Sequence, residues 1–326
     1  MLSKTYIIAG PTASGKSGFA HALAKQIGGV IINCDSVQMY RGIEIISASP
    51  FADNSCLPLI EGECHAKRDE GELPPVASGD SPPQKGGHKS FCEINNVPYH
   101  LFSVLPLNQQ ISVGEYLDMA RDVYNTAIRS GTPVIFVGGT GFYINAILNG
   151  ISAMPAVSDV NRKRARDMVR DDIDAVRELL GPGAPSDPQR AARALEILFE
   201  TGRPITEWQS EPRTGAIVPD AIKFLINPPR EILAARIPAR IPGMIAAGAI
   251  DEARKMTDPS RAIGGAEIMQ FVRGEIDEPT MIANWTIKTN QYAKRQRTWF
   301  KHQFSADIII GNIPGAADLE NAKNMI

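Results

Sequence analysis

The stretch G-P-T-A-S-G-K-S at residues 10–17 decides the fold of this chain. It follows a short apolar run at residues 6–9 and precedes apolar side chains that recur at helical spacing from Phe19 to Ile27. Strand, glycine-rich loop and helix in this order are typical of a phosphate-binding P-loop of the kind found in ATP-binding proteins. Such a loop turns its backbone N–H groups towards phosphate oxygens, and the helix dipole adds attraction. The predicted phosphate-binding residues are Gly10, Pro11, Thr12, Ala13, Ser14, Gly15, Lys16 and Ser17.

Two side chains of this loop have specific expected roles. Lys16 supplies a positive charge, and the hydroxyl of Ser17 is a ligand for Mg²⁺. The loop alone leaves three classes open: a small-molecule kinase, a nucleotide-dependent switch, and a transferase with a diphosphate leaving group. A GTPase switch would normally carry an N-K-x-D motif, and the sequence has none.

Length and composition restrict the class of protein. The 326 residues correspond to one large or two modest domains, and 43% hydrophobic with 21% charged residues excludes a disordered or fibrous chain. The formal charge of −2 gives no global field for nucleic acid. No apolar run approaches the roughly 18 residues of a membrane span, and the N-terminal run is short for a signal peptide. We therefore expect a cytoplasmic protein without a membrane partner.

Two further apolar runs end in residues suited to a site. Residues 30–34 lead into Asp35, and residues 132–137 lead into G-G-T-G at 138–141. In an open parallel sheet, ligands lie at the carboxyl ends of the strands, which predicts that Asp35 lies near the bound phosphates. A carboxylate there would hold a Mg²⁺-bound water or act as a general base, or else cap the next turn. The glycines either let a ligand approach the backbone or form a tight strand-to-helix turn.

Six segments occur in a characteristic order along the chain. They are G-P-T-A-S-G-K-S, C-D-S-V-Q-M-Y-R-G (34–42), V-P-Y-H-L (97–101), V-G-G-T-G-F-Y (137–143), D-P-Q-R-A-A-R-A-L-E (187–196) and A-K-R-Q-R-T-W-F (293–300). In these segments the chain resembles the tRNA dimethylallyltransferase family, also called tRNA isopentenyltransferases. The resemblance implies an α/β fold: a P-loop NTPase-like core with a mostly parallel sheet and a small helical insertion domain. The expected domains are a core at 1–150, an insertion domain contacting tRNA at 151–186, and C-terminal helices completing the core and the tRNA channel at 187–326.

The resemblance also implies a reaction. A dimethylallyl group would pass from dimethylallyl diphosphate to N6 of adenosine 37, in the anticodon arm of tRNA, with Mg²⁺ as cofactor and the protein acting as a monomer. The P-loop and Mg²⁺ would stabilise charge on the leaving diphosphate. Three alternatives stay open: prenyl transfer to free adenine nucleotides, a small-molecule kinase, and a nucleotide-regulated RNA-binding protein without catalysis.

Individual roles follow from the resemblance, position by position. Asp35 would accept the N6 proton, Thr12 would donate to the bridging oxygen of the diphosphate, and Lys16 and Arg236 would hold the diphosphate. The residues expected to contact tRNA are Asp35, Ser36, Val37, Gln38, Thr140, Arg162, Asp187, Pro188, Gln189, Arg190 and Ala191.

The chain departs from the family pattern in several places. Residues 51–96 form an apparent insertion with eight acidic and four basic residues, which predicts a disordered acidic segment. A zinc site is a weaker alternative for this segment, on Cys56, Cys64, His65, His88 and Cys92. Ser49 stands where the family usually has a lysine. Pro238 and Pro242 predict a broken or kinked helix beside Arg236.

Two segments are strongly basic. Residues 161–170 hold five bases and one acid, and the stretch from Arg162 to Leu180 predicts one or two helices that end at Gly181. Residues 285–304 hold five bases and no acid. Basic and aromatic side chains together are typical of an RNA surface, whereas an amphipathic helix would bury the aromatic ones in the core. The aromatic residues of this second segment are Trp285, Tyr292, Trp299, Phe300 and Phe304.

Overall fold

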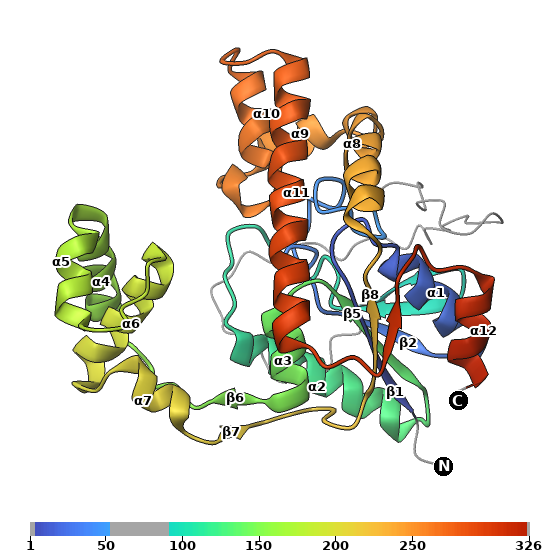
Figure 1. The fold of residues 1–326 in the computed structure, drawn as a ribbon, viewed down its shortest axis with the longest axis horizontal. Coiled ribbons are helices and arrows are strands. Elements are labelled where there is room, and N and C mark those ends of the chain that lie inside the picture. Colours follow the sequence, from blue (N-terminus) through green and yellow to red (C-terminus); the bar gives the residue numbers. More distant parts are fainter. Residues whose placement is uncertain (1–3, 53–90, 325–326) are drawn as a thin grey trace, which may run out of the picture. The chain divides into compact units, whose positions relative to one another are not determined.

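The central feature of the fold is a seven-stranded sheet with strand order β3-β4-β2-β5-β1-β8-β9 (Figure 1). The computed structural model describes residues 4–52 and 91–324. All pairings in the sheet are parallel except the antiparallel β3–β4 pair, which confirms the predicted mostly parallel sheet. The strands are β1 Thr5–Ala9, β2 Val30–Asn33, β3 Phe91–Ile94, β4 Val97–His100, β5 Val134–Gly138, β8 Ile222–Ile226 and β9 Ile308–Ile310.

The described residues also form helices, several of which connect the strands of the sheet. They are α1 Lys16–Ile27, α2 Val113–Arg129, α3 Gly141–Asn149, α4 Asp159–Asp171, α5 Ile173–Leu180, α6 Pro188–Thr201, α7 Ile205–Ser210, α8 Arg230–Ala246, α9 Ala249–Lys255, α10 Gly265–Val272, α11 Glu278–Gln303 and α12 Ala316–Asn324. A 3-10 turn spans Pro259–Arg261, and a two-stranded ladder joins β6 Ile151–Ser152 to β7 Arg213–Thr214. Among the described residues, no helix is both long and apolar enough to cross a membrane.

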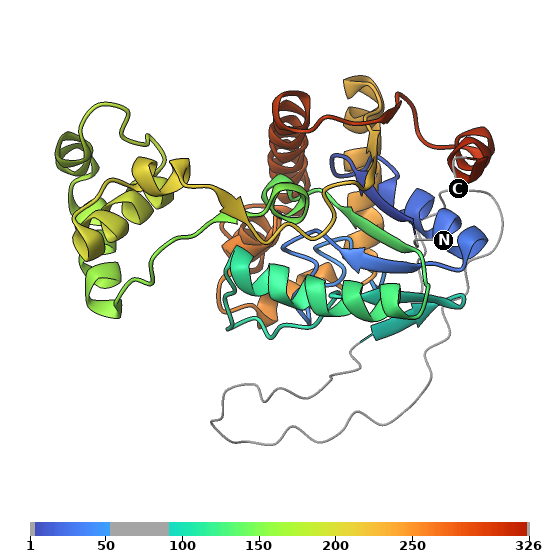
Figure 2. The same ribbon diagram turned by 90° about the horizontal axis from the view of Figure 1, so that it is seen from below.

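The two faces of the sheet are covered by different helices. Alternate residues of a strand point to opposite faces, so Tyr6 and Ile8 share a core with Phe19 and Leu23 of α1. On the other face, Tyr124 of α2 lies against the ring of Phe136 in β5. Figure 2 shows α1 and α2 on opposite sides of the strands. This arrangement leaves the carboxyl ends of β1, β2 and β5 together at one edge.

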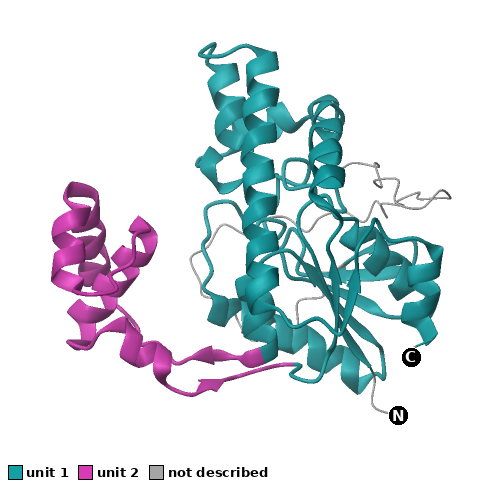
Figure 3. Ribbon diagram, in the orientation of Figure 1, with its two compact units in different colours: residues 1–148, 218–326 teal, residues 149–217 magenta. Residues whose placement is uncertain are grey.

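The chain divides into two compact units, one of residues 1–148 and 218–326 and one of residues 149–217 (Figure 3). The insertion therefore extends to residue 217 and not to 186, because α6 and α7 belong to it. The alanine-rich face of α6 explains this boundary: Ala191 and Leu195 are fully buried in a small core with Ala165 of α4 and Val176 of α5. The predicted helices between Arg162 and Leu180 are confirmed as α4 and α5, and Gly181 follows the last helical residue.

Two other expectations from the sequence need correction or restriction. Pro238 and Pro242 lie inside one continuous helix, α8. Burial of Leu233, Ile237 and Ile241 along one face of α8 offsets the backbone hydrogen bonds that the two prolines cannot make. Residues 53–90 of the predicted disordered insert, with Cys56, Cys64, His65 and His88, lie outside the described residues. The end of that insert is ordered, because residues 91–94 form β3.

The basic C-terminal segment forms the long helix α11. Its aromatic residues divide into two groups: Trp285, Phe300 and Phe304 are buried, as the amphipathic alternative predicts, while Tyr292 and Trp299 are half-buried. Four of its basic side chains are exposed, namely those of Lys288, Lys294, Arg295 and Lys301. One face of α11 thus packs the core of its unit, and the other presents positive charge to solvent.

Candidate active site

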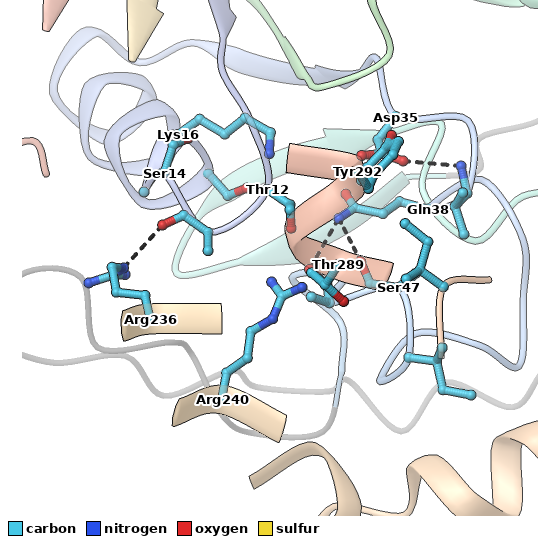
Figure 4. A pocket seen from close by; sticks show the side chains of 17 residues that line it. Thr12, Ser14, Lys16, Asp35, Gln38, Ser47, Arg236, Arg240, Thr289 and Tyr292 are labelled. Atoms are coloured by element: carbon cyan, nitrogen blue, oxygen red, sulfur yellow. Dashed lines mark hydrogen bonds between the residues drawn. The ribbon is translucent and has the colours of Figure 1, made fainter. Parts of the chain in front are cut away.

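A pocket lies at the carboxyl edge of the sheet, and the P-loop forms one of its walls (Figure 4). Residues 12–17 line it, whereas Gly10 and Pro11 are buried behind the lining. Gly15 precedes the first turn of α1 with φ 92°, a backbone conformation that favours glycine. The first turn of α1 therefore presents its N–H groups at the pocket, as a P-loop requires.

Three cationic side chains enter this pocket. Lys16 is buried, and its Nζ donates to the carbonyl of Pro11 at 3.4 Å. Arg236 of α8 donates from Nε to the carbonyl of Ala13 at 3.0 Å, which fixes its guanidinium beside the P-loop. Arg240 lies one turn further along α8, and its buried Nε has no hydrogen-bond partner among the described residues.

The charges of these groups are poorly compensated. Burial lowers the pKa of Lys16 against the opposing attraction of Asp35, and Arg240 lowers it further. Burial, together with nearby Arg236, lowers the pKa of Arg240 to about 10. Since a buried charge is stabilised by an opposite one, three cations facing one carboxylate form a site for an anion carrying several negative charges.

Asp35 follows β2 and is half-buried in the wall of the pocket. Its Oδ1 accepts a hydrogen bond from the N–H of Val37 at 3.1 Å, and its own N–H donates to Oδ1 of Asn33 at 2.8 Å. The buried Asn33 amide in turn donates to the carbonyls of Asp35 and Leu101. The carboxylate does make the predicted turn contact, and it also faces the pocket, where it interacts with Lys16.

The turn after β5 is packed against protein. The hydroxyl of Thr140 accepts from the N–H of Ser36 at 3.0 Å, so these two predicted tRNA-contacting residues lie together. A Cβ at Gly138 would overlap the backbone of Cys34, one at Gly139 the amide of Gln296, and one at Gly141 the ring of Trp299. The glycines thus permit close packing of chain segments, which favours the tight-turn interpretation over ligand approach.

The loop after β2 and the turn that precedes α10 complete the pocket with apolar side chains. Val37, Ile46, Ala48 and Ile263 line this part. The buried Gln38 donates from Nε2 to the carbonyls of Ser47 and Ala48, both at 3.1 Å, and so holds the loop in place. Of the predicted tRNA-contacting residues, Val37 and Gln38 therefore belong to the pocket lining, and Gln38 has a structural contact as well.

Sequence reasoning missed several residues of this pocket. Arg240, Thr289 and Tyr292 line it, and Gln296 lies behind the P-loop. The available signal for Arg240 was its spacing of four from Arg236, which places both on one helical face. Pro238 lies between the two arginines, and with Pro242 it predicts a break or kink in that helix, which weakens this signal. Ser49, where the resemblance led us to expect a lysine, is buried outside the lining, and its backbone N–H donates to the carbonyl of Glu44.

The remaining predicted tRNA-contacting residues belong to the unit of residues 149–217. Arg162 is paired with Asp159 at 2.8 Å on an exposed face of α4. Asp187 caps α6 by accepting from the N–H of Arg190 at 3.0 Å, and Pro188, Gln189 and Arg190 are exposed. Ala191 is fully buried. Its side chain packs the core of this unit, so we correct its expected role from contact to packing.

The donor set of the pocket fits the Mg²⁺ expected there. Ser17, in the first turn of α1, and Asp35 both line it and supply the hard oxygen ligands that Mg²⁺ prefers. Within the described residues, no cluster of three or more histidine, cysteine or acidic side chains forms a full metal cage. Magnesium at a P-loop takes only one or two protein ligands, because substrate phosphates and water supply the others.

Fold and site together define a P-loop protein with a pocket lined by three cationic side chains. The family model for IPP transferase matches residues 88–303, and a model for isopentenyl transferase matches residues 3–55. The chain belongs to the IPP transferase family.

Individual relatives agree with this assignment. The chain is 35% identical to a tRNA dimethylallyltransferase of Bradyrhizobium sp., over 93% of this chain and 92% of that one. It is 32% identical to a tRNA dimethylallyltransferase of Paramagnetospirillum magneticum, over 93% and 89%.

Solved structures share the fold. A tRNA isopentenylpyrophosphate transferase of Bacillus halodurans superposes with a TM-score of 0.60 at 24% identity, covering 99% of this chain and 95% of that one. A eukaryotic dimethylallyltransferase described as acting on tRNA gives a TM-score of 0.69 at 20% identity, covering 99% and 78%. The predicted P-loop NTPase-like fold class is thereby confirmed.

Proposed function

We propose that this protein transfers a dimethylallyl group from dimethylallyl diphosphate to N6 of adenosine 37 in the anticodon arm of tRNA. One observation carries the proposal: a single pocket combines a cationic P-loop side, an apolar side and one carboxylate. A diphosphate matches the cations, and a five-carbon prenyl chain matches Val37, Ile46, Ala48 and Ile263. The family relatives named tRNA dimethylallyltransferases support the same reaction.

The donor side of the pocket would stabilise the leaving group. As the bond between C1 of the prenyl group and the bridging oxygen breaks, negative charge grows on the diphosphate. Lys16, Arg236 and Arg240 are already in place to stabilise this charge, which avoids reorganisation during the reaction. The hydroxyl of Thr12 would donate to the bridging oxygen. Magnesium held by Ser17 would supply further electrostatic stabilisation of the diphosphate.

The part of the pocket around Asp35 would supply the base for the reaction. The N6 amine of adenosine forms a bond to C1, and the carboxylate of Asp35 accepts the proton that the amine loses. The products are the prenylated amine and free diphosphate, so atoms and charge balance. Val37 fixes one oxygen of Asp35 through its N–H, which orients the carboxylate.

The exposed basic residues would bind tRNA. Lys288, Lys294, Arg295 and Lys301 of α11 would contact phosphates, and Arg162 and Arg190 of the insertion unit would contact another part of the anticodon arm. A small acceptor such as AMP has no need of these cations. The protein would act as a monomer.

The test is a prenyl-transfer assay with radiolabelled dimethylallyl diphosphate and Mg²⁺. Unmodified tRNA with adenosines at positions 36 and 37, AMP and ATP serve as parallel acceptors. We expect label in tRNA alone. Label in AMP or ATP would move the protein to the class that modifies free adenine nucleotides. No label with intact tRNA binding would overturn the proposed transfer, and consumption of ATP with a small acceptor would indicate a kinase.

A further inference from the structure

A buried amide links the P-loop to the turn after β5. Gln296 lies on the packed face of α11 and is 5% exposed. Its Oε1 accepts a hydrogen bond from the N–H of Thr12 at 2.8 Å, and its Nε2 donates to the carbonyl of Gly139 at 2.9 Å. The two partners are backbone groups, so their sequence positions do not reveal the link. Both functional atoms of the side chain are used in bonds that join separate elements.

The chemistry of these partners suits an amide side chain. Thr12 presents a donor and Gly139 an acceptor, so the bridging group needs one acceptor and one donor on a planar end. Only one orientation of an amide satisfies both. A Cβ at position 139 would overlap Nε2 of Gln296, so the amide keeps its place only when residue 139 is glycine. Glycine at 139 and glutamine at 296 therefore form a matched pair.

The two linked segments carry different halves of the reaction. Thr12 belongs to the P-loop, which faces the diphosphate in the proposed function. Gly139 precedes Thr140, whose hydroxyl contacts Ser36 next to Asp35. A shift of either segment would change the distance between the leaving group and the proton acceptor. Misplacement of reacting groups by about 1 Å can cost as much as 100-fold in rate.

We infer that Gln296 is a positioning residue that holds the P-loop and the Gly139–Thr140 turn at a fixed separation, and so aligns donor and acceptor for transfer. This inference rests on the proposed function. Gln296 itself contacts neither substrate. Its contribution appears in the chemical step, because the exposed cations that would bind tRNA lie elsewhere on α11 and in the other unit.

The experiment compares three variants under single-turnover conditions with saturating tRNA and dimethylallyl diphosphate. Gln296→Met keeps the volume and removes both hydrogen bonds. Gln296→Glu keeps the acceptor for Thr12 and loses the donor to Gly139 unless the carboxyl is protonated. Gln303→Met makes the same change at an exposed position at the end of the same helix and is the control. Melting temperature and tRNA affinity are measured for each.

We expect Gln296→Met to lower the single-turnover rate at least about tenfold, with tRNA affinity within twofold of wild type and Gln303→Met unchanged. For Gln296→Glu, the rate relative to wild type at the same pH should rise as pH falls, because a protonated carboxyl donates to Gly139 again. Burial raises the pKa of a carboxyl, which brings this effect into a usable pH range.

Three results separate failure of the inference from failure of the proposed function. An active wild type with an unchanged single-turnover rate in Gln296→Met overturns the positioning role, even where the melting temperature falls. A rate of Gln296→Glu that stays in constant ratio to wild type across pH argues against the donor bond to Gly139. A wild type that transfers no label overturns the proposed function and this inference with it.

Discussion

The pocket and the insertion unit use polar side chains in opposite ways. At the pocket, hydrogen bonds join residues 104, 157, 223 and 284 positions apart, in Ser36–Thr140, Gly139–Gln296, Ala13–Arg236 and Thr12–Gln296. In the insertion unit, ion pairs such as Arg162–Asp159 and Lys163–Asp167 join residues three or four positions apart on exposed helix faces. Buried links between distant segments specify one geometry. Exposed pairs contribute less than about 1 kcal/mol each and exchange readily for phosphate partners.

The largest effect is expected from a substitution that removes only the chemistry of the pocket. Asp35→Asn keeps an oxygen for the N–H of Val37 and removes the proton acceptor. Turnover should fall by roughly 100- to 10,000-fold, the usual contribution of a general base, while tRNA affinity stays within twofold. Single-turnover transfer and filter binding measure the two quantities. Unchanged turnover would remove Asp35 from the mechanism.

A second substitution separates binding from stability within the pocket. Arg240→Met should weaken dimethylallyl diphosphate binding by about tenfold or more, because one of three cations is lost. It should also raise the melting temperature, since a buried and unpartnered Nε and its repulsion from Arg236 disappear. Calorimetric titration and thermal unfolding test this. Arg230→Met, at an exposed site on the same helix, is the control, and a lower melting temperature of Arg240→Met than of this control would contradict the explanation.

A substitution in the insertion unit tests whether its exposed cations bind tRNA without affecting the pocket. Arg190→Ala should raise KM for tRNA by about threefold to tenfold and reduce the salt dependence of tRNA binding by about one phosphate contact. Affinity for dimethylallyl diphosphate should not change. Arg254→Ala is the control. It removes another exposed arginine, which lies on α9 of the other unit and pairs with Asp251 one helical turn away. Equal effects of the two variants on KM would argue against a specific contact.

The smallest expected effect concerns pH. Burial lowers the pKa of Lys16 below its ordinary value of 10.5, so the folded protein binds fewer protons there than the unfolded chain. Between the lowered value and 10.5, stability should therefore rise with pH, while diphosphate affinity falls as the charge is lost. Unfolding and titration experiments across this range, with Lys16→Met as reference, measure both slopes. If stability and diphosphate affinity changed in the same direction with pH, the assignment to Lys16 would be contradicted.

The local parts of the fold followed from sequence, and the assembled parts did not. The first strand, the P-loop and α1 were predicted because each depends on neighbouring residues: apolar periodicity, the glycine at 15 and the glycines after residue 27. The end of the insertion at 217 was missed, because the small residues of α6 reveal their packing partner only when α4 lies against them. Continuity of α8 was missed for the same reason, since burial of Ile237 and Ile241 outweighs two prolines.

The candidate site shows the same division. Lys16, Asp35 and Arg236 were predicted from motifs, and the structure brings all three into one pocket. Arg240 and Gln296 received no individual role, and Tyr292 was expected at an RNA surface, because no local pattern shows which further side chains of α8 and α11 face the P-loop. Ala191 was wrongly expected to face a ligand, since a motif identifies a segment but not which of its side chains is exposed.

By itself, the sequence determined the class of this protein: a P-loop, a carboxylate at the end of the second strand, and the ordered motifs of a single family. Each of these features depends on residues close together in the chain, so it can be predicted from the sequence before the tertiary structure is known. Only the tertiary structure decided how the P-loop is held, which cations share its pocket, and which side chain packs against Gly139. Each of these depends on contacts between residues more than 100 positions apart, and such contacts exist only once helices and sheet have packed together.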